Sequence, residues 1–342
     1  MKITDVSLEL VDLPTQPQFN WRAGLAGSEG PTTGGILRLH TDAGITGEAH
    51  TRRGRSAAEA VDRWIRDDLV GLDPLDRELL WHRIWQIDRR DPLALPVFGL
   101  VDLAAWDLAG KLAGWPLWRL LGGFRTSIDA YASTVTYGSI DEYLDVADQV
   151  LARGFRAIKI HAWGDVDADA ELAHRLRSHV GPGIPLYYDG SAGFDLVDAI
   201  RLGRALASAG FAWYEEPMLE YGVAPYSELA RKVEIPLLVG ETSPGSHLNA
   251  ADFILAGAAG ALRVSPHLKG GITGSLRIAH LADAFRLRAE VHAGGIVQQH
   301  LCMAIPNNSY YEALVWGNPI QTDPAVGSDG RIVAPIAPGI GW

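Results

Sequence analysis

Three acidic residues recur at equal spacing through the middle of this 342-residue chain. Asp189, Glu215 and Glu241 each end a short apolar run, and each precedes a stretch with helical periodicity. Their period of about 26 residues is the length of one strand–helix unit, so each carboxylate falls at the C-terminal tip of a successive parallel strand. The strand tips of a βα barrel converge on one mouth, where three carboxylates would repel one another unless a cation lay between them. Hard oxygen ligands of this kind suit Mg²⁺, so the spacing predicts a metal-dependent enzyme.

Candidate acid–base groups flank the three acids. Lys159 and His161 end the preceding predicted strand, and a strand has a period of two, so both side chains point to the same side. His292 and Glu312 lie on the last two predicted strands. A metal that stabilises an enediolate oxygen, combined with a base and an acid, is what removal of a proton alpha to a carboxylate requires.

The elements that must position these residues are eight predicted strands separated by helical stretches. The strands cover residues 127–133, 155–161, 185–189, 212–216, 236–241, 260–265, 288–292 and 309–313. Strands that alternate with helices indicate an α/β fold with a parallel sheet, and eight of them indicate a barrel over residues 121–316.

Residues 1–120 predict a smaller α+β domain, and we expect residues 317–342 to pack back on it. The domain has a strand at 1–12, a hairpin at 35–50 and helices near 56–69, 75–87 and 94–112. A loop at residues 16–31 is too long for a simple connection, and its Trp21 and Arg22 are suited to cover a site. His50, Arg52 and Arg53 either approach an anionic substrate or belong to a solvated loop.

Composition excludes several classes of function. The net charge of −11 and the pI near 5.4 argue against nucleic acid or an anionic membrane as partner. The single cysteine, Cys302, precludes an internal disulfide framework. We found neither a signal peptide nor a long apolar span in the sequence, so we expect a cytoplasmic enzyme that acts on a small molecule.

In the order and spacing of its motifs, nearly the whole chain resembles the mandelate racemase-like subgroup (mandelate racemase/muconate lactonizing enzymes) of the enolase superfamily. The motifs are LVDLAAWDLAGKLAGWPLWRLLGG (100–123), AIKIH (157–161), YYDGS (187–191), WYEEP (213–217), VGETS (239–243), KGGITG (269–274), EVHAGG (290–295) and YYEAL (310–314).

The resemblance implies a (β/α)7β barrel with an N-terminal α+β capping domain. It also implies Mg²⁺ on Asp189, Glu215 and Glu241, with the acid adjacent to Glu215, Glu216, facing away. Abstraction of the proton alpha to a substrate carboxylate would begin the reaction. Residues 16–31 and about 50–55, which include Trp21, Arg22 and His50, would set specificity. A homo-oligomer is expected.

Two residues depart from the subgroup's pattern. His161 stands where the second Lys of a Lys-x-Lys pair is usual, so either His161 or Lys159 takes the proton. The reference pKa of imidazole, about 6.5, suits a base at neutral pH. Ser265 stands where the subgroup has an Asp that orients the seventh-strand His, or a catalytic Lys. His292 therefore lacks the expected carboxylate and is either catalytic or only substrate-binding, with His267 and Lys269 nearby in sequence.

These residues favour dehydration of an acid sugar, because a dehydratase needs one good base and one acid. Racemisation, epimerisation or lactone cycloisomerisation of a carboxylate by the same site is the first alternative. A barrel that binds a carboxylate without turnover is the alternative from another class.

Overall fold

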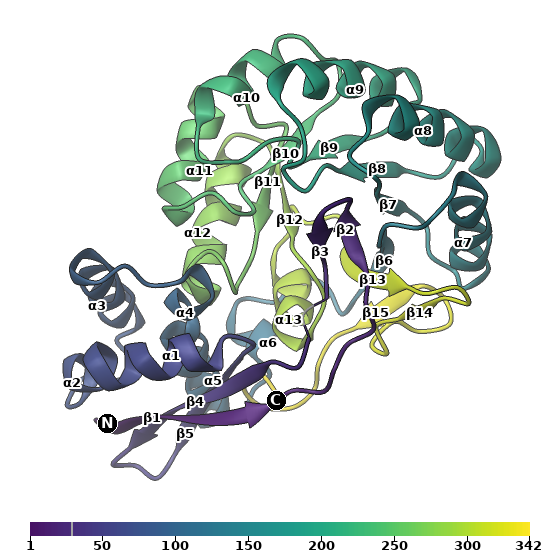
Figure 1. Ribbon diagram of the computed structural model, residues 1–342. Coiled ribbons are helices and arrows are strands. Elements are labelled where there is room, and N and C mark those ends of the chain that lie inside the picture. The colour runs from purple at the N-terminus through teal and green to yellow at the C-terminus, as the bar shows by residue number, and fades with distance from the viewer. Residues whose placement is uncertain (29) are drawn as a thin grey trace.

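The computed structural model describes residues 1–28 and 30–342, and its larger part is a parallel barrel (Figure 1). Its strands are β6 (Ser127–Thr134), β7 (Ile158–His161), β8 (Leu186–Asp189), β9 (Trp213–Glu215), β10 (Leu237–Val239), β11 (Ala261–Val264), β12 (Arg288–Val291) and β13 (Tyr311–Trp316). Parallel pairing runs from β12 through β11, β10, β9, β8, β7 and β6 to β13. The predicted strands therefore exist, with the last one displaced toward the C-terminus.

A helix follows each barrel strand except the last, which is the (β/α)7β order predicted from the sequence. The helices are α7 (Ile140–Ala152), α8 (Val166–Val180), α9 (Leu196–Ser208), α10 (Val223–Ala230), α11 (Ser246–Leu255), α12 (Gly271–Ala284) and α13 (Ile296–Ala304). Polar side chains cap several N-termini: Ser139 accepts from an amide of α7, Asp165 from α8 and Asp195 from α9.

The capping domain is an antiparallel sheet covered by helices. The sheet consists of β1 (Ile3–Asp12), β4 (Thr33–Thr41) and β5 (Thr46–Thr51). The helices are α1 (Gly54–Ala60), the π-helical turn η1 (Val61–Ile65), α2 (Arg66–Leu69), α3 (Arg77–Arg90), α4 (Leu95–Phe98), α5 (Leu100–Ala113) and α6 (Leu117–Leu120). The helix predicted at 94–112 is split at Gly99, where a Cβ would meet the backbone of Gly271 at 2.5 Å.

The loop at residues 16–31 contains a small hairpin, β2 (Asn20–Arg22) and β3 (Leu25–Ala26); residue 29 lies outside the described residues. Figure 1 shows this hairpin reaching from the capping domain to the barrel. The amide of Thr136 donates to Asn20 O at 2.9 Å, and the amide of Ala23 donates to Trp163 O at 3.2 Å. The loop is therefore fastened to barrel residues through its main chain.

The C-terminal segment touches both parts of the chain. Strands β14 (Gln321–Thr322) and β15 (Arg331–Val333) pair with β13 and β6. Beyond them, the amide of Ile340 donates to Asp107 on α5, and Trp342 donates to Glu48 O on β5. Among the described residues, no helix has the length and apolar character needed to cross a membrane.

Side chains that fill the barrel interior form two layers. The lower layer is an apolar and aromatic cluster: Tyr131, Ala157, Tyr187, Trp213, Leu238 and Ala261, with Tyr310 packed against it. The rings of Tyr187 and Trp213 stack with centroids 3.4 Å apart. Two residues further along β7, β8, β9 and β11, the same faces carry charged side chains. The aromatic layer therefore forms the floor beneath those charges.

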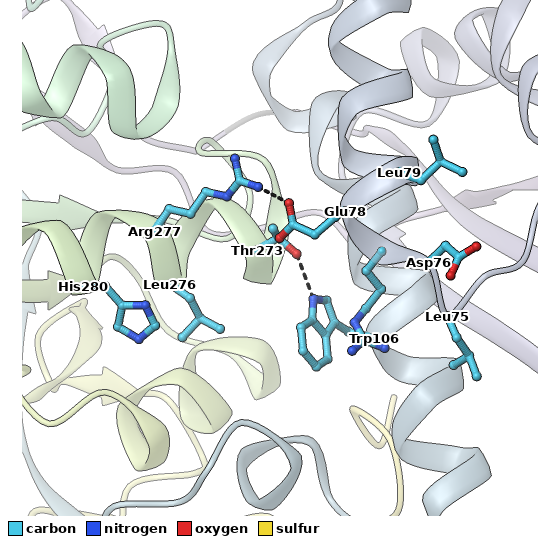
Figure 2. A pocket seen from close by; sticks show the side chains of 10 residues that line it. Leu75, Asp76, Glu78, Leu79, Trp106, Thr273, Leu276, Arg277 and His280 are labelled. Atoms are coloured by element: carbon cyan, nitrogen blue, oxygen red, sulfur yellow. Dashed lines mark hydrogen bonds and ion pairs between the residues drawn. The ribbon is translucent and has the colours of Figure 1, made fainter.

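The capping domain is joined to the barrel helix α12 by buried polar contacts. Asp102 on α5 accepts from the amide and the hydroxyl of Thr273, at 2.9 and 2.5 Å. A cavity of about 660 Å³ lies beside this junction, between α3, α5 and α12 (Figure 2). Trp106 and Arg277 line it, and Arg277 forms an ion pair with Glu78. None of the acids and bases from the strand tips is among its lining residues.

Candidate metal centre and acid–base site

Neighbouring strand ends bring the three spaced acids together. Asp189 is paired in register with Glu215 on the next strand, and Glu241 follows the end of β10 by two residues. Each of the three offers a carboxylate oxygen, and these oxygens all lie within 4.8 Å of one another. The side chains of Asp189 and Glu215 are buried, whereas that of Glu241 is partly open to solvent at 16%.

Crowding and burial perturb the protonation of these acids. Burial raises the pKa of Glu215 to about 8, although Arg263 and Lys159 lower it. Burial and the charge of Asp189 raise the pKa of Glu241 to about 7. Burial also acts to raise the pKa of Asp189, but Lys159 and His161 outweigh it and hold that pKa well below its usual range. Three converging oxygen donors with unfavourable mutual charge fit a hard divalent cation such as Mg²⁺.

Lys159 lies at the centre of the charged layer. Its Nζ is 3.0 Å from Asp189 Oδ2, 2.7 Å from Glu215 Oε2 and 2.8 Å from Glu312 Oε1, and its side chain is 1% exposed. Burial favours the neutral amine, but the charges of Glu215, Glu312 and Asp189 raise the pKa of Lys159 well above its usual value. These contacts favour the cationic form of Lys159.

His161 has a tautomer fixed by its surroundings. Its Nδ1 lies 2.6 Å from Thr134 O, and since a carbonyl only accepts, Nδ1 carries the proton of the neutral ring. The lone pair is then on Nε2, which faces the metal side of the site, 3.2 Å from Asp189 Oδ2. The indole of Trp21 packs on the imidazole, with ring centroids 4.6 Å apart.

His292 faces the site from the opposite side of the three acids. Its Nε2 lies 3.1 Å from Glu241 Oε1, and its Nδ1 lies 3.3 Å from Ser265 Oγ. Ser265 therefore lies beside the outer nitrogen of His292, where the motif alignment led us to expect it. Burial lowers the pKa of His292 to about 3, and the nearby cations Arg263 and Lys159 contribute to that shift. A pKa this low favours the neutral ring.

Glu312 extends the charged layer toward β12. Its Oε2 accepts from the amide of Ala293 at 2.7 Å, the residue after His292. Burial acts to raise the pKa of Glu312, but Arg263 and Lys159 hold it well below its usual range. Glu312 is thus an anion placed between two cations.

Arg263 was missed by the sequence reasoning. It lies on β11 with no exposed side-chain surface, 2.5 Å from Glu215 and 2.8 Å from Glu312. The available signal was the strand period: Arg263 precedes Ser265 by two residues, so both point into the barrel.

The residues of the capping domain that were expected to bind substrate lie in two different places. Trp21 and Arg22 come from the hairpin, and Arg22 Nε donates to Ser191 O at 3.0 Å, two residues beyond Asp189. His50 instead stacks on Trp342, with centroids 4.3 Å apart, and its Nε2 lies 2.8 Å from Glu48 Oε1.

His50 lines a second cavity, of about 420 Å³, together with Arg52, Arg53 and His267. Burial lowers the pKa of His267 to about 4.

Three further residues considered from the sequence have partners outside the cluster of three acids. Glu216 accepts from the Thr242 hydroxyl at 2.5 Å. Lys269 donates to Ser243, and Trp163 donates through its indole to Tyr137 O.

Comparison with known proteins agrees with this architecture. Residues 142–342 match the model of the enolase C-terminal domain-like family. Residues 27–122 match that of the mandelate racemase/muconate lactonizing enzyme N-terminal domain. The fold and site thus define an enolase-superfamily enzyme. The chain belongs to the mandelate racemase/muconate lactonizing enzyme family of that superfamily.

Similar proteins within the family act on acid sugars. The chain is 31% identical to a 3,6-anhydro-alpha-L-galactonate cycloisomerase of Streptomyces coelicolor, over 89% of this chain and 87% of the relative. It is 26% identical to an L-talarate/galactarate dehydratase of Salmonella typhimurium, over 100% and 88% of the two chains. A D-glucarate dehydratase from Agrobacterium tumefaciens, solved with magnesium, superposes with a TM-score of 0.88 at 30% identity, over 99% and 95%.

Proposed function

We propose that this protein removes the proton alpha to the carboxylate of an acid sugar and expels the beta hydroxyl, which makes it an acid-sugar dehydratase. A Mg²⁺ ion held by Asp189, Glu215 and Glu241 would supply positive charge where the substrate carboxylate becomes more negative. Lys159 and Glu312, one a cation and the other an anion, would orient the substrate beside those ligands. Trp21 and Arg22 would cover it from the capping domain.

The single observation that carries this proposal is the geometry of His161. The Thr134 carbonyl holds the proton on Nδ1, so the lone pair on Nε2 would accept the alpha proton. The imidazolium formed in this way would be an acid on the same face of the substrate. His161 can therefore return that proton to the departing beta hydroxyl, which leaves as water, and the resulting enol tautomerises to a 2-keto acid. One residue serves as base and then as acid.

His292, on the other side of the three acids, supports elimination over racemisation. A racemase exchanges protons on both faces of the alpha carbon and needs a second group that is ready to ionise there. His292 is the group on that side, but its pKa is lowered to about 3 by burial and its outer nitrogen meets a hydroxyl rather than a carboxylate. A neutral His292 is suited to hydrogen-bond the substrate.

Cycloisomerisation is the second candidate. The observation that favours it is the 31% identity to a 3,6-anhydro-alpha-L-galactonate cycloisomerase. It needs the same proton removal beside a carboxylate, followed by departure of a ring oxygen instead of a hydroxyl. Its product retains all atoms of the substrate, whereas dehydration loses water.

A screen in D₂O separates these outcomes. The purified protein with Mg²⁺ is incubated with mono- and diacid sugars and with their lactones and anhydro derivatives, and products are followed by NMR and mass spectrometry. Loss of water to give a 2-keto product that carries one solvent deuteron at the beta carbon supports dehydration. An isomer of unchanged heavy-atom composition supports cycloisomerisation. Alpha-deuterium incorporation without either product supports racemisation, and no exchange with any compound argues against catalysis.

A further inference from the structure

Arg263 is a fixed cation inside the barrel, directly behind the metal ligands. It lies on β11 (Ala261–Val264), and both of its carboxylate partners are almost fully buried. Its Nε is 2.5 Å from Glu215 Oε1, while its Nη2 is 3.1 Å from Glu215 Oε2. The same Nη2 is 2.8 Å from Glu312 Oε2 and 3.1 Å from the hydroxyl of Tyr131.

The ionised side chains of this layer carry more negative than positive charge. Asp189, Glu215, Glu241 and Glu312 would contribute four negative charges when ionised, and Lys159 and Arg263 contribute two positive ones. A guanidinium keeps its proton in proteins, so Arg263 supplies one of these charges at every physiological pH. A divalent cation on the acids brings the sum to zero.

The contact between Arg263 and Glu215 also constrains the carboxylate. Oε2 of Glu215 accepts from Arg263 Nη2 and from Lys159 Nζ, whereas Oε1 makes an ion-pair contact with Arg263 Nε but no hydrogen bond. With Oε2 held in this way, Glu215 has one oxygen left to offer a metal. Mg²⁺ takes six ligands in a strict octahedron, whereas Ca²⁺ takes six to eight and commonly binds a carboxylate through both oxygens.

We propose that Arg263 is a positioning residue that holds Glu215 for one-oxygen coordination and thereby makes the site prefer Mg²⁺ over Ca²⁺. The proposal rests on the metal site of the proposed function but not on its substrate or product. A merely structural ion pair would stabilise the barrel without changing the ratio of the two metal affinities.

The test is calorimetric titration of metal-free, full-length protein with MgCl₂ and with CaCl₂, without substrate, at one pH. Arg263→Lys keeps the positive charge but loses the fork, and Arg263→Gln loses both. Outer-shell partners typically change metal affinity by 10–100-fold. We expect both variants to bind Mg²⁺ at least about tenfold more weakly, with Ca²⁺ affinity changed less than about threefold.

Arg177→Gln is the matched control. Arg177 donates to four main-chain carbonyls on the outside of the barrel, those of Ala209, Gly181, Ile184 and Gly210, so its loss costs hydrogen bonds but leaves the site intact. This variant should keep the metal preference of the unmodified protein. Circular dichroism and thermal unfolding establish that each protein is folded.

The outcomes separate the inference from the proposed function. An unmodified protein that binds no Mg²⁺ overturns the metal site itself. An unmodified protein that prefers Mg²⁺, with the same ratio in folded Arg263→Lys or Arg263→Gln, overturns only the role of Arg263. If neither variant folds, Arg263 is a structural residue and the inference is wrong.

Discussion

The outer ring nitrogen of His292 lies 3.3 Å from the hydroxyl of Ser265. A serine hydroxyl can donate to a neutral imidazole, but it brings no negative charge to stabilise an imidazolium. The other nitrogen meets Glu241, which a bound Mg²⁺ would share. This pairing distinguishes the two histidines of the site: the carbonyl of Thr134 fixes the tautomer of His161, whereas a hydroxyl rather than a carboxylate meets Nδ1 of His292.

Replacement of Ser265 by Asp should make the imidazole of His292 easier to protonate. A carboxylate beside Nδ1 raises the pKa of His292 by about 1–3 units, the usual effect of an opposite charge within about 4–6 Å. Titration of the imidazole signals by NMR measures this shift. Ser265→Ala is the control and should leave the pKa of His292 low. An unchanged His292 titration in a folded Ser265→Asp protein contradicts the assigned contact.

Replacement of His161 by Asn should stop proton transfer while metal binding persists. Loss of a general base typically costs 10²–10⁴-fold in rate, so alpha-proton exchange in D₂O should fall by about that factor. Calorimetry should give nearly unchanged Mg²⁺ affinity. His179→Asn, on the outside of the barrel where His179 pairs with Asp148, is the control. Exchange that continues at its original rate in His161→Asn would assign the base to Lys159.

Replacement of Trp21 by Ala should weaken catalysis, because it removes a side chain of the capping domain that packs on His161. The indole packs on His161, and aromatic pairs are worth about 0.5–1.5 kcal/mol beyond their buried area. This corresponds to about a two- to tenfold fall in kcat/KM with the best substrate of the screen. Trp21→Phe keeps a ring and should lose less. Equal kcat/KM in all three proteins would show that Trp21 does not support His161.

The junction between capping domain and barrel should make stability depend on pH. Burial raises the pKa of Asp102 to about 7, whereas an unfolded aspartate titrates near 3.9. The folded protein thus holds more protons between these values, and its free energy of unfolding falls as pH rises from about 4 to about 7, by at most about 1.4 kcal/mol per pH unit.

Asp102→Asn cannot titrate at this position, so the stability advantage of the unmodified protein over this variant should shrink across that range and level off above it. Thermal unfolding at pH 5, 6, 7 and 8 measures the difference. Asp141→Asn, an exposed acid at the start of α7, supplies the control. A difference that stays constant from pH 5 to pH 8 would show that Asp102 is ionised throughout.

Periodicity and spacing were enough to predict the barrel and the convergence of the three acids. Apolar runs that end in Asp189, Glu215 and Glu241 are a strong local signal, because burial and strand formation use the same residues. The register between β8 and β9 then places two of these acids side by side. The family resemblance also predicted the place of Ser265 beside His292.

Other features depend on contacts between segments far apart in the chain. Arg263 looks like an ordinary charged residue in sequence, and only the barrel brings it to Glu215, Glu312 and Tyr131. The helix predicted at 94–112 is broken at Gly99 because the backbone of α12 approaches closely there. His50 lies on β5 in the N-terminal part of the chain, yet it stacks on Trp342 from the other end of the chain. Local patterns do not encode such approaches.

The hairpin of residues 20–26 has a kinetic consequence. Three hydrogen bonds to main-chain groups of the barrel hold it: the carbonyl of Asn20 accepts from Thr136, while Arg22 and the amide of Ala23 donate to carbonyls. At about 0.5–1.5 kcal/mol net for each bond, release costs only a few kcal/mol and is readily reversible. Loop openings of this kind take microseconds to milliseconds and often limit product release. Opening of the hairpin can therefore limit the turnover rate of this protein. In that case the turnover rate would fall as solvent viscosity rises.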